Sequence, residues 1–115
     1  MATHKSFAEY IANQAGENAR LRAMFGEYGI YYNEKFVGLI CDDSVFVKIT
    51  SGTAQWLESN TEKGSPYPGA KEHYIITEDV VSKQDYFKQI LQKASDDLPD
   101  ISKKKSNRSS KNPKS

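Results

Sequence analysis

The sequence has only one cysteine, no long hydrophobic run, and no apolar residue after position 101. With Cys41 alone, no intramolecular disulfide can form, which excludes a small secreted scaffold held by disulfide bridges. No stretch approaches the roughly 18 consecutive apolar residues of a membrane-spanning helix. A secretory signal begins with a basic segment followed by an apolar one, whereas the N-terminal segment of this chain carries Glu9 and Glu17. These absences predict a cytoplasmic protein with no membrane contact.

Charge and apolar content both change at position 101. The 115-residue chain has a formal net charge of +1. Residues 1–101 contain ten Lys and Arg against fifteen Asp and Glu. Residues 102–115 contain six Lys and Arg and no Asp or Glu. A segment without apolar side chains buries nothing that would offset the entropy of ordering it. We therefore predict one domain with a single core over residues 1–101 and a disordered basic tail over residues 102–115.

Apolar residues at helical spacing predict a helix near each end of the domain. Ser6 and Glu9 are spaced as a capping box, and Gly16 is expected to end the helix that they begin. A short helix capped by Thr50 or Ser51 follows the strands. The last helix is expected to start at Ser82 and to bury the stripe Tyr86, Phe87, Ile90, Leu91 and Ala94.

Aromatic and β-branched residues interrupted by turn residues predict consecutive antiparallel strands. They are placed at 20–25, 28–32, 36–41 and 44–49, with turns at 33–35 and 42–43. Gly26 and Gly29 leave open a single bent strand in place of the first two. Gly64, Pro66, Pro68 and Gly69 predict a loop, and 73–77 is the next strand.

This order, α-β-β-β-α-β-α with a fourth meander strand possible, predicts an α+β fold of two layers, an antiparallel sheet of about five strands with helices on one face. Val45, Val47 and Ile49 are expected to face the helices. Phe46 would point the other way, and strand 36–41 is apolar on both sides, as in a covered sheet. Either a partner, such as a second copy, or the N-terminal helix or tail would cover the second face.

Residue types and spacing show no catalytic constellation, so no catalytic residue, metal or cofactor is predicted. To act as a nucleophile, Cys41 would need His4 or His73 as a base. A buried structural thiol is the simpler interpretation of this residue. Asp42 and Asp43 suit acid–base chemistry or a cation, but two Asp between apolar runs first indicate a hairpin turn.

The tail offers cations for contacts with nucleic-acid phosphates, which are nonspecific and weakened by salt. Contacts with the acidic domain or a solubilising role are the alternatives. The cations are Lys103, Lys104, Lys105, Arg108, Lys111 and Lys114.

Two segments, MFGEYGIYYNEKFVGLICDDSVFVK and SPYPGAKEHYII, resemble the N-terminal domain of the TfoX family, bacterial competence regulators also called Sxy. The resemblance is strongest over 24–48 and 66–76 and extends over 1–95. The matching signature residues are Met24, Phe25, Gly26, Gly29, Tyr31, Tyr32, Gly38, Leu39, Asp42, Lys48, Tyr67, Pro68, Gly69 and Ala70.

This resemblance implies a two-layer fold similar to that of secretion chaperones, with no assigned catalytic residue. It also implies a role in regulating transcription of DNA-uptake genes, together with the cyclic-AMP receptor protein. Such regulators carry a second, C-terminal domain, and this chain has a lysine-rich tail where it would begin. We therefore expect a stand-alone N-terminal domain.

Three functional hypotheses follow. In the preferred one, the chain is a non-enzymatic regulatory or adaptor domain that contacts a protein partner, such as a transcription regulator, through the sheet face or the 66–69 loop. The second is a small enzyme or ligand-binding domain with a pocket between the sheet and this loop, whose polar groups are Cys41, Asp42, Asp43, Tyr67 and His73. The third is a structural homodimer. The residues expected at a partner contact are Met24, Phe25, Gly26, Tyr28, Gly29, Tyr31, Tyr32, Phe46, Tyr67, Pro68 and Gly69.

Overall fold

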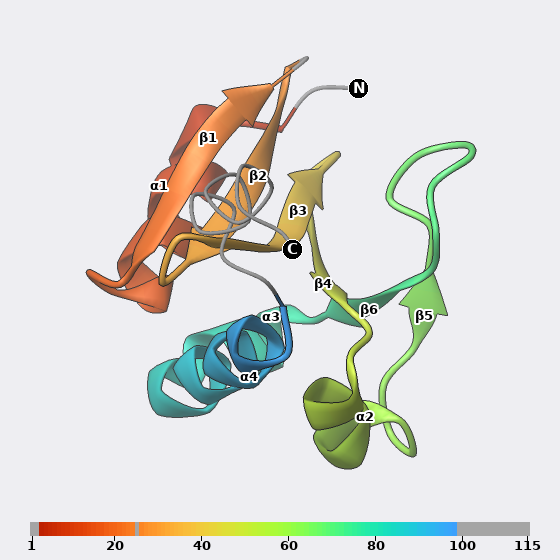
Figure 1. The fold of residues 1–115 in the computed structure, drawn as a ribbon. Coiled ribbons are helices and arrows are strands. Elements are labelled where there is room, and N and C mark those ends of the chain that lie inside the picture. The colour runs from red at the N-terminus through yellow and green to blue at the C-terminus, as the bar shows by residue number, and fades with distance from the viewer. Residues whose placement is uncertain (1–2, 25, 99–115) are drawn as a thin grey trace, which may run out of the picture.

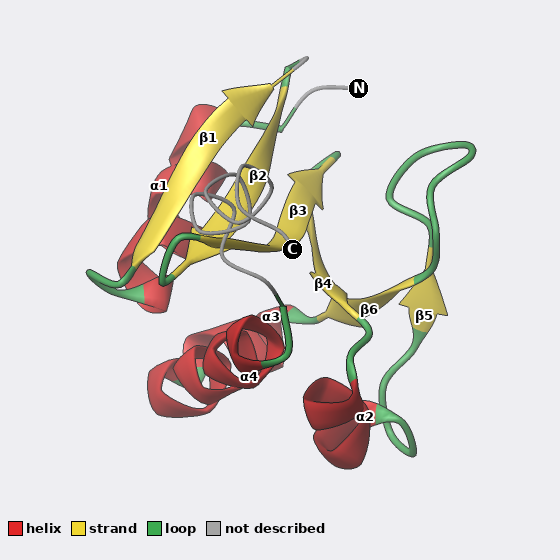
Figure 2. Ribbon diagram, in the orientation of Figure 1, coloured by secondary structure: helices red, strands yellow, loops and turns green. Residues whose placement is uncertain are grey.

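The computed structural model of the chain describes residues 3–24 and 26–98. The helices are α1 Lys5–Ala15, α2 Ser51–Leu57, α3 Glu78–Ser82 and α4 Gln84–Asp96. The strands are β1 Ala19–Met24, β2 Glu27–Tyr32, β3 Lys35–Cys41, β4 Ser44–Lys48, β5 Lys63–Gly64 and β6 His73–Ile76. In this part of the chain the strands form one antiparallel sheet of six, in the order β1-β2-β3-β4-β6-β5 (Figures 1 and 2).

The helices pack on one face of the sheet and enclose the main core. Helix α4 contacts β2, β3 and β4 as well as the other three helices, and α1 also contacts β1 (Figure 1). Fully buried side chains come from both layers, among them Ile11, Ile30, Val47, Tyr74 and Phe87. Each such side chain contributes about 1.5–3 kcal/mol when it leaves water. The predicted two-layer α+β fold is confirmed.

Two tight turns hold β2, β3 and β4 in a meander. Asn33 and Glu34 have φ values of 51° and 66°, and Asp42 and Asp43 have values of 52° and 59°. Two-residue loops with positive φ at both positions are type I′ turns, whose twist matches that of the flanking strands. The turns predicted at 33–35 and 42–43 are confirmed, and Asp42 and Asp43 form a hairpin turn.

The helix starts differ from the predictions. Helix α1 begins at Lys5 after His4, so the capping box of Ser6 and Glu9 is wrong, although the helix ends before Gly16 as predicted. Ser82 ends α3 and does not start α4. The sequence did not reveal α3 because five residues are too few to display a helical apolar stripe. Thr50 caps α2 reciprocally with Thr53, as one of the two predicted alternatives.

The strands differ in smaller ways. Met24 pairs with Glu27, so β1 and β2 are separate strands and the single bent strand is wrong. Ile30 pairs with Gly38 and Tyr31 with Phe36, which leaves Val37 as the extra residue of a β-bulge. Two-residue β5 was not predicted.

The end of β4 also differs from the prediction. Ile49 lies outside β4 and is 39% exposed, because the chain turns there toward α2, so its predicted core position is wrong. The predicted domain boundary at 101 and the tail 102–115 lie outside the described residues. No helix of the described part is long and apolar enough to cross a membrane.

The second face of the sheet carries its own apolar cluster. Phe46 points away from the main core, as predicted, and packs with Leu39 and Cys41 from β3. The N-terminal helix does not cover this face, because Ile11 and Ala15 of α1 are part of the main core. The alternative in which that helix covers the second face is therefore wrong.

Replacing Gly38 by alanine tests the close approach of β3 to β4. A Cβ atom at Gly38 would lie 2.2 Å from the carbonyl oxygen of Phe46, which is backbone and cannot move aside. We expect Gly38→Ala to lower the free energy of unfolding by about 3 kcal/mol or more, as for a severe overpacking.

Gly69→Ala is the matched control for this measurement. A Cβ at Gly69 meets nothing within 4 Å, and the φ of 89° adds only local backbone strain, which costs about 1–2 kcal/mol. Urea unfolding of both variants and of the wild type measures how much free energy of unfolding each substitution removes. An equal or smaller loss for Gly38→Ala would contradict the packing seen at β3 and β4.

Candidate functional site

A groove of about 890 Å³ lies between the face of the sheet opposite the helices and the loop that joins β5 to β6. Phe36, Leu39 and Cys41 of β3 form its floor, and Tyr67 and its neighbouring prolines form the opposite wall. Figure 1 shows this loop extending from β5 and β6, apart from the helices. Ligand sites in proteins typically measure about 300–1,000 Å³. The groove is therefore large enough for a small molecule or several side chains of a peptide.

The floor continues into a row of aromatic and cationic side chains across four strands. The rings of Tyr31 and Phe36 lie 5.2 Å apart between their centroids. The Arg20 guanidinium lies 5.0 Å from the Tyr31 ring, and Lys48 Nζ lies 4.5 Å from the Phe36 ring. These distances fall within the range of cation–π attraction. The row places a positive charge at each side of these two half-buried rings.

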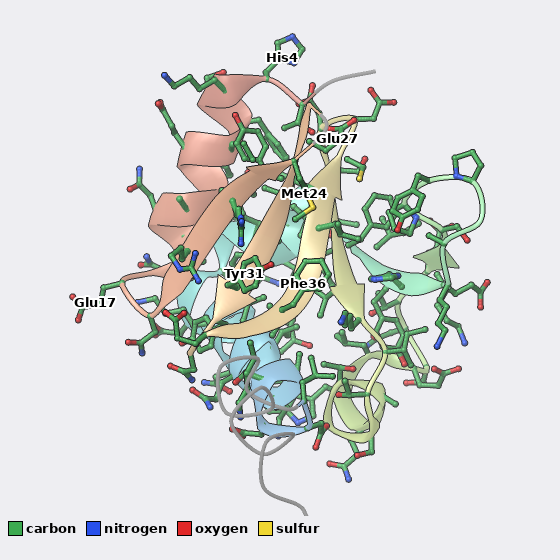
Figure 3. All side chains as sticks on the ribbon, turned by 45° about the horizontal axis from the view of Figure 1, so that its top comes forward. His4, Glu17, Met24, Glu27, Tyr31 and Phe36 are labelled. Atoms are coloured by element: carbon green, nitrogen blue, oxygen red, sulfur yellow. The ribbon has the colours of Figure 1, made fainter. Side chains whose placement is uncertain are left out.

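Gly29 of β2 makes room for this floor. A Cβ atom there would lie 2.6 Å from Met24 Cε and 3.0 Å from Phe36 Cε1. Figure 3 shows Met24, Tyr31 and Phe36 gathered on the same face of the sheet. Without a side chain at position 29, residues of β1 and β3 meet across β2.

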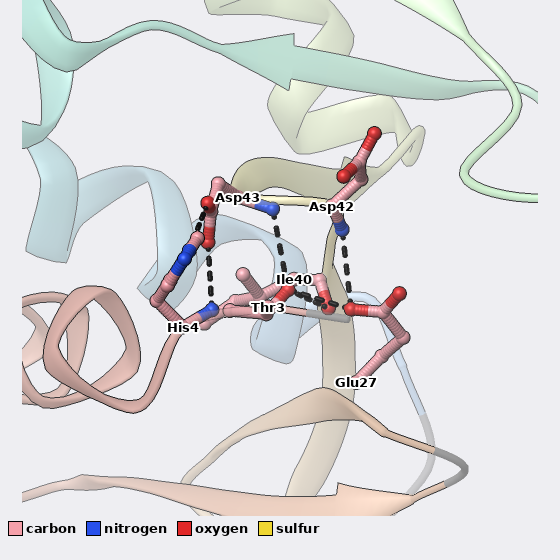
Figure 4. Close-up of polar contacts among 6 residues, drawn as sticks. All are labelled: Thr3, His4, Glu27, Ile40, Asp42 and Asp43. Carbon is pink, nitrogen blue, oxygen red and sulfur yellow. Dashed lines mark hydrogen bonds and ion pairs between the residues drawn. The ribbon is translucent and has the colours of Figure 1, made fainter. Parts of the chain in front are cut away.

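A polar network holds the turn between β3 and β4 (Figure 4). Thr3 Oγ1 donates a hydrogen bond of 2.6 Å to Glu27 Oε1, which also accepts one of 3.1 Å from the Asp42 backbone N–H. The His4 N–H donates to Asp43 Oδ1 at 2.8 Å, and His4 Nδ1 lies 2.6 Å from Asp43 Oδ2. These bonds to His4 lower the pKa of the Asp43 carboxyl. The N-terminal segment therefore fixes the end of the groove that Asp42 lines.

The ionisable groups of the groove are not arranged for nucleophilic chemistry. Burial raises the pKa of the Cys41 thiol, and the carboxylates of Glu27 and Asp42 raise it further. His73 Nδ1 lies 2.9 Å from the carbonyl oxygen of Lys71, an acceptor, so this nitrogen carries the proton. Burial lowers the pKa of His73, and the charge of Lys48 lowers it further, against the opposing effect of the bond to Lys71.

The structure brings together most of the polar groups named in the second hypothesis. Cys41, Asp42, Tyr67 and His73 line one groove, whereas Asp43 points to His4 instead. The described residues include no group of three or more His, Cys, Asp or Glu side chains placed to hold a metal ion.

The residues expected at a partner contact divide between several surroundings. Tyr67 is 54% exposed and lines the groove, as do Met24 and Pro68. Tyr32 was expected to be exposed for a partner contact, but it is only 5% exposed and packs in the main core with Tyr28 at its edge, so this expected exposure is wrong. The register of β2 places both on the helix side.

Two other predicted contact residues, Phe46 and Phe25, and the tail cations need separate mention. Phe46 lies in the second cluster and is 8% exposed. Phe25 lies outside the described residues, as do the six tail cations. Their predicted roles stay predictions.

Sequence reasoning missed Glu27, Phe36 and Lys71 as groove residues. Alternation in 36–41 places Phe36 on the face of Ile40, and only the bulge at Val37 moves it to the face of Leu39, so the alternation was no signal for Phe36. Lys71 had no local signal, since only the path of the loop brings it to β4.

The geometry defines a two-layer α+β domain with one groove between its sheet and a proline-containing loop. The family model described as "TfoX N-terminal domain" matches residues 11–98. A protein of Spirochaeta aurantia, "Uncharacterized 12.7 kDa protein in trpE 5'region", is 42% identical over 101 residues, which cover 86% of this chain and 86% of that protein. The chain belongs to the TfoX N-terminal domain family, and the resemblance seen in its residues is confirmed.

Alkylation of Cys41 tests the assignment of this thiol as unreactive. Because its pKa is raised above the ordinary 9.0, we expect iodoacetamide to modify Cys41 at pH 7 more slowly than it modifies free cysteine. Mass spectrometry over a range of pH measures the rate, with the chain in guanidinium as the control for burial. A rate at pH 7 above that of free cysteine would indicate an activated nucleophile.

Proposed function

We propose that this chain is a non-enzymatic regulatory or adaptor domain that binds a segment of a protein partner in the groove. The groove itself carries this proposal, because an apolar floor and an exposed Tyr67 face each other across open space. Aromatic and apolar side chains with a polar rim are typical of the centres of protein interfaces. A partner segment would bury the Phe36 ring and Tyr67 together.

The chemistry of the groove favours binding over bond making. Cys41 has a raised pKa, and no hydrogen bond joins its thiol to His73 in the described part of the chain, so the two groups do not form an activated pair. The backbone N–H of Asp42 and one oxygen of Glu27 are used to hold a turn. Family membership adds an expected link to transcription, with a transcription regulator as the partner.

Truncation of Tyr67 tests the groove as the partner site. The side chain is exposed, so Tyr67→Ala is expected to leave the fold intact and to weaken partner binding about tenfold, as for an aromatic interface residue. Partners captured from the native cell by the full chain would be identified, purified and titrated against both forms by calorimetry.

Ile49→Ala is the matched control for Tyr67→Ala. Ile49 is the other large apolar side chain that is exposed in the described residues, and it does not line the groove. Equal losses in both variants, or none in Tyr67→Ala, would reject the groove as the partner site. If the captured partner is a second copy of the chain, sedimentation of wild type and Tyr67→Ala shows a dimer that the substitution weakens.

The tail is proposed to add nonspecific contacts with DNA. A full-length variant with Gln at Lys103, Lys104, Lys105, Arg108, Lys111 and Lys114 keeps the length and removes six charges. We expect wild-type binding to duplex DNA to fall with salt with a log–log slope of up to about −5, and the variant to lose this slope. Fluorescence anisotropy at two salt concentrations measures it. Equal binding by both forms would exclude a role for the tail.

A small-molecule ligand is the second candidate occupant. Its support is that Cys41, Asp42, Tyr67 and His73 line one groove of suitable volume. Such a ligand would protect Cys41 from alkylation in the folded chain. If a partner segment protects Cys41 from alkylation and no small molecule does, the result favours the protein partner as the occupant of the groove.

A further inference from the structure

Lys48 is a half-buried cation without a counter-charge at one end of the groove. It extends from β4 over the ring of Phe36, with Nζ 4.5 Å from the ring centroid. None of the three ion pairs among residues 3–24 and 26–98 involves it. The charged group that acts on it most is the like charge of Lys71. Two cations thus share one end of an apolar groove.

This arrangement is electrostatically unfavourable in the empty groove. Burial lowers the pKa of Lys48, and the positive charge of Lys71 lowers it further. A partly buried charge is costly unless an opposite charge accompanies it. The described residues place no negative charge beside Lys48. An anion supplied by a ligand would therefore offset both the burial of the Lys48 charge and its repulsion by Lys71.

The fold brings a third nitrogen to the same end. Lys48 pairs with His73 in the register of β4 and β6, and the carbonyl of Lys71 holds His73 Nδ1. The carboxylates that line the groove, Glu27 and Asp42, lie beyond Cys41 at the opposite end of β3. The groove is therefore cationic at one end, apolar along its floor and acidic at the other end.

We propose that the partner segment bound in the groove is an extended stretch in which apolar side chains adjoin an acidic side chain. Its carboxylate would lie between Lys48 and Lys71, and its apolar side chains would lie on Phe36 and Leu39. This inference rests on the proposed function and specifies the chemistry of the partner. The chain's own tail is not the occupant, because residues 102–115 contain no acidic or apolar residue.

The length of the floor limits the segment. Residues 36 and 41 are five steps apart on β3, and a strand rises about 3.3 Å per residue, or about 17 Å in total. A segment of about five residues in extended form spans it.

The test uses two peptide pools of defined chemistry. Each holds acetylated and amidated peptides of about eight residues, with Leu, Ile or Phe at two central positions followed by Asp or Glu in one pool and by Asn or Gln in its twin. We expect the full-length chain to bind the acidic pool about tenfold more tightly than the amide pool in anisotropy titrations.

Lysine variants assign this preference to the groove. Lys48→Gln with Lys71→Gln should abolish the preference for the acidic pool. Lys5→Gln with Lys83→Gln removes the same number of charges from exposed positions on the helix layer and should retain it. If thermal unfolding shows that Lys48→Gln perturbs the fold, Lys71→Gln alone, at an exposed position, serves instead. Loss of the preference in the helix-layer control would overturn the proposal.

A second readout is independent of folding by the variants. In the wild-type chain, the acidic pool should raise the pKa of Lys48, followed by NMR at its side-chain carbon atoms, and the amide pool should not. Equal effects of the two pools would overturn the inference.

Other results separate the inference from the proposed function. If both pools bind equally and Tyr67→Ala weakens both, the groove binds peptides but the acidic requirement is wrong. If neither pool binds, the inference is wrong, and the capture of a partner with the Tyr67→Ala comparison still decides the proposed function. Tighter binding of single-stranded oligo-dT through Lys48 and Lys71 would replace a peptide with a nucleic acid as the occupant.

Discussion

Strand β3 buries apolar side chains on both faces, and the rest of the structure depends on this. Val37 and Ile40 face the helices in the main core, whereas Leu39 and Cys41 face the second cluster. Strict alternation would not place 37 and 40 on one face, so the bulge at Val37 is needed to change the register. The same bulge directs Phe36 to the second face. One local irregularity therefore supplies both the core that stabilises the domain and the floor of the groove.

Close packing within the sheet depends on two positions without side chains, Gly38 on the helix face and Gly29 on the second face. Gly38 lets β3 approach the backbone of β4, and Gly29 lets Met24 and Phe36 meet across β2. The loop between β5 and β6 then stands over this surface and leaves Tyr67 exposed. Because proline fixes its own φ and lacks an N–H, a loop with Pro66 and Pro68 can stay ordered without pairing as a strand. Hydrogen bonds from the Ala70 N–H to the Tyr67 carbonyl and from Ser65 Oγ to the Ala70 carbonyl also hold this wall of the groove.

Much of the fold was predictable from local chemistry, and the failures have physical causes. Paired Asp residues indicated the hairpin turn, and the spacing of Phe87 and Ile90 indicated α4, because turn and helix signals act over a few residues. The exposure of Tyr32 was misjudged because a face assignment depends on register, which distant strands set. Lys71 was missed for a different reason, because no local pattern shows where the loop between β5 and β6 leads. The approach of Lys71 to Lys48 is a property of the loop path.

The residues through which the chain resembles its family converge on the groove from two separate segments. The signature residues that line it are Met24, Leu39, Asp42, Lys48, Tyr67, Pro68 and Ala70. A core needs apolar side chains of suitable size, but it does not need a half-buried lysine beside a second lysine. Lys48 lies in cation–π contact with Phe36 but makes no ion pair among the described residues, so its charge has no opposite charge beside it. The acidic segment that we propose as the occupant of the groove would supply this missing negative charge.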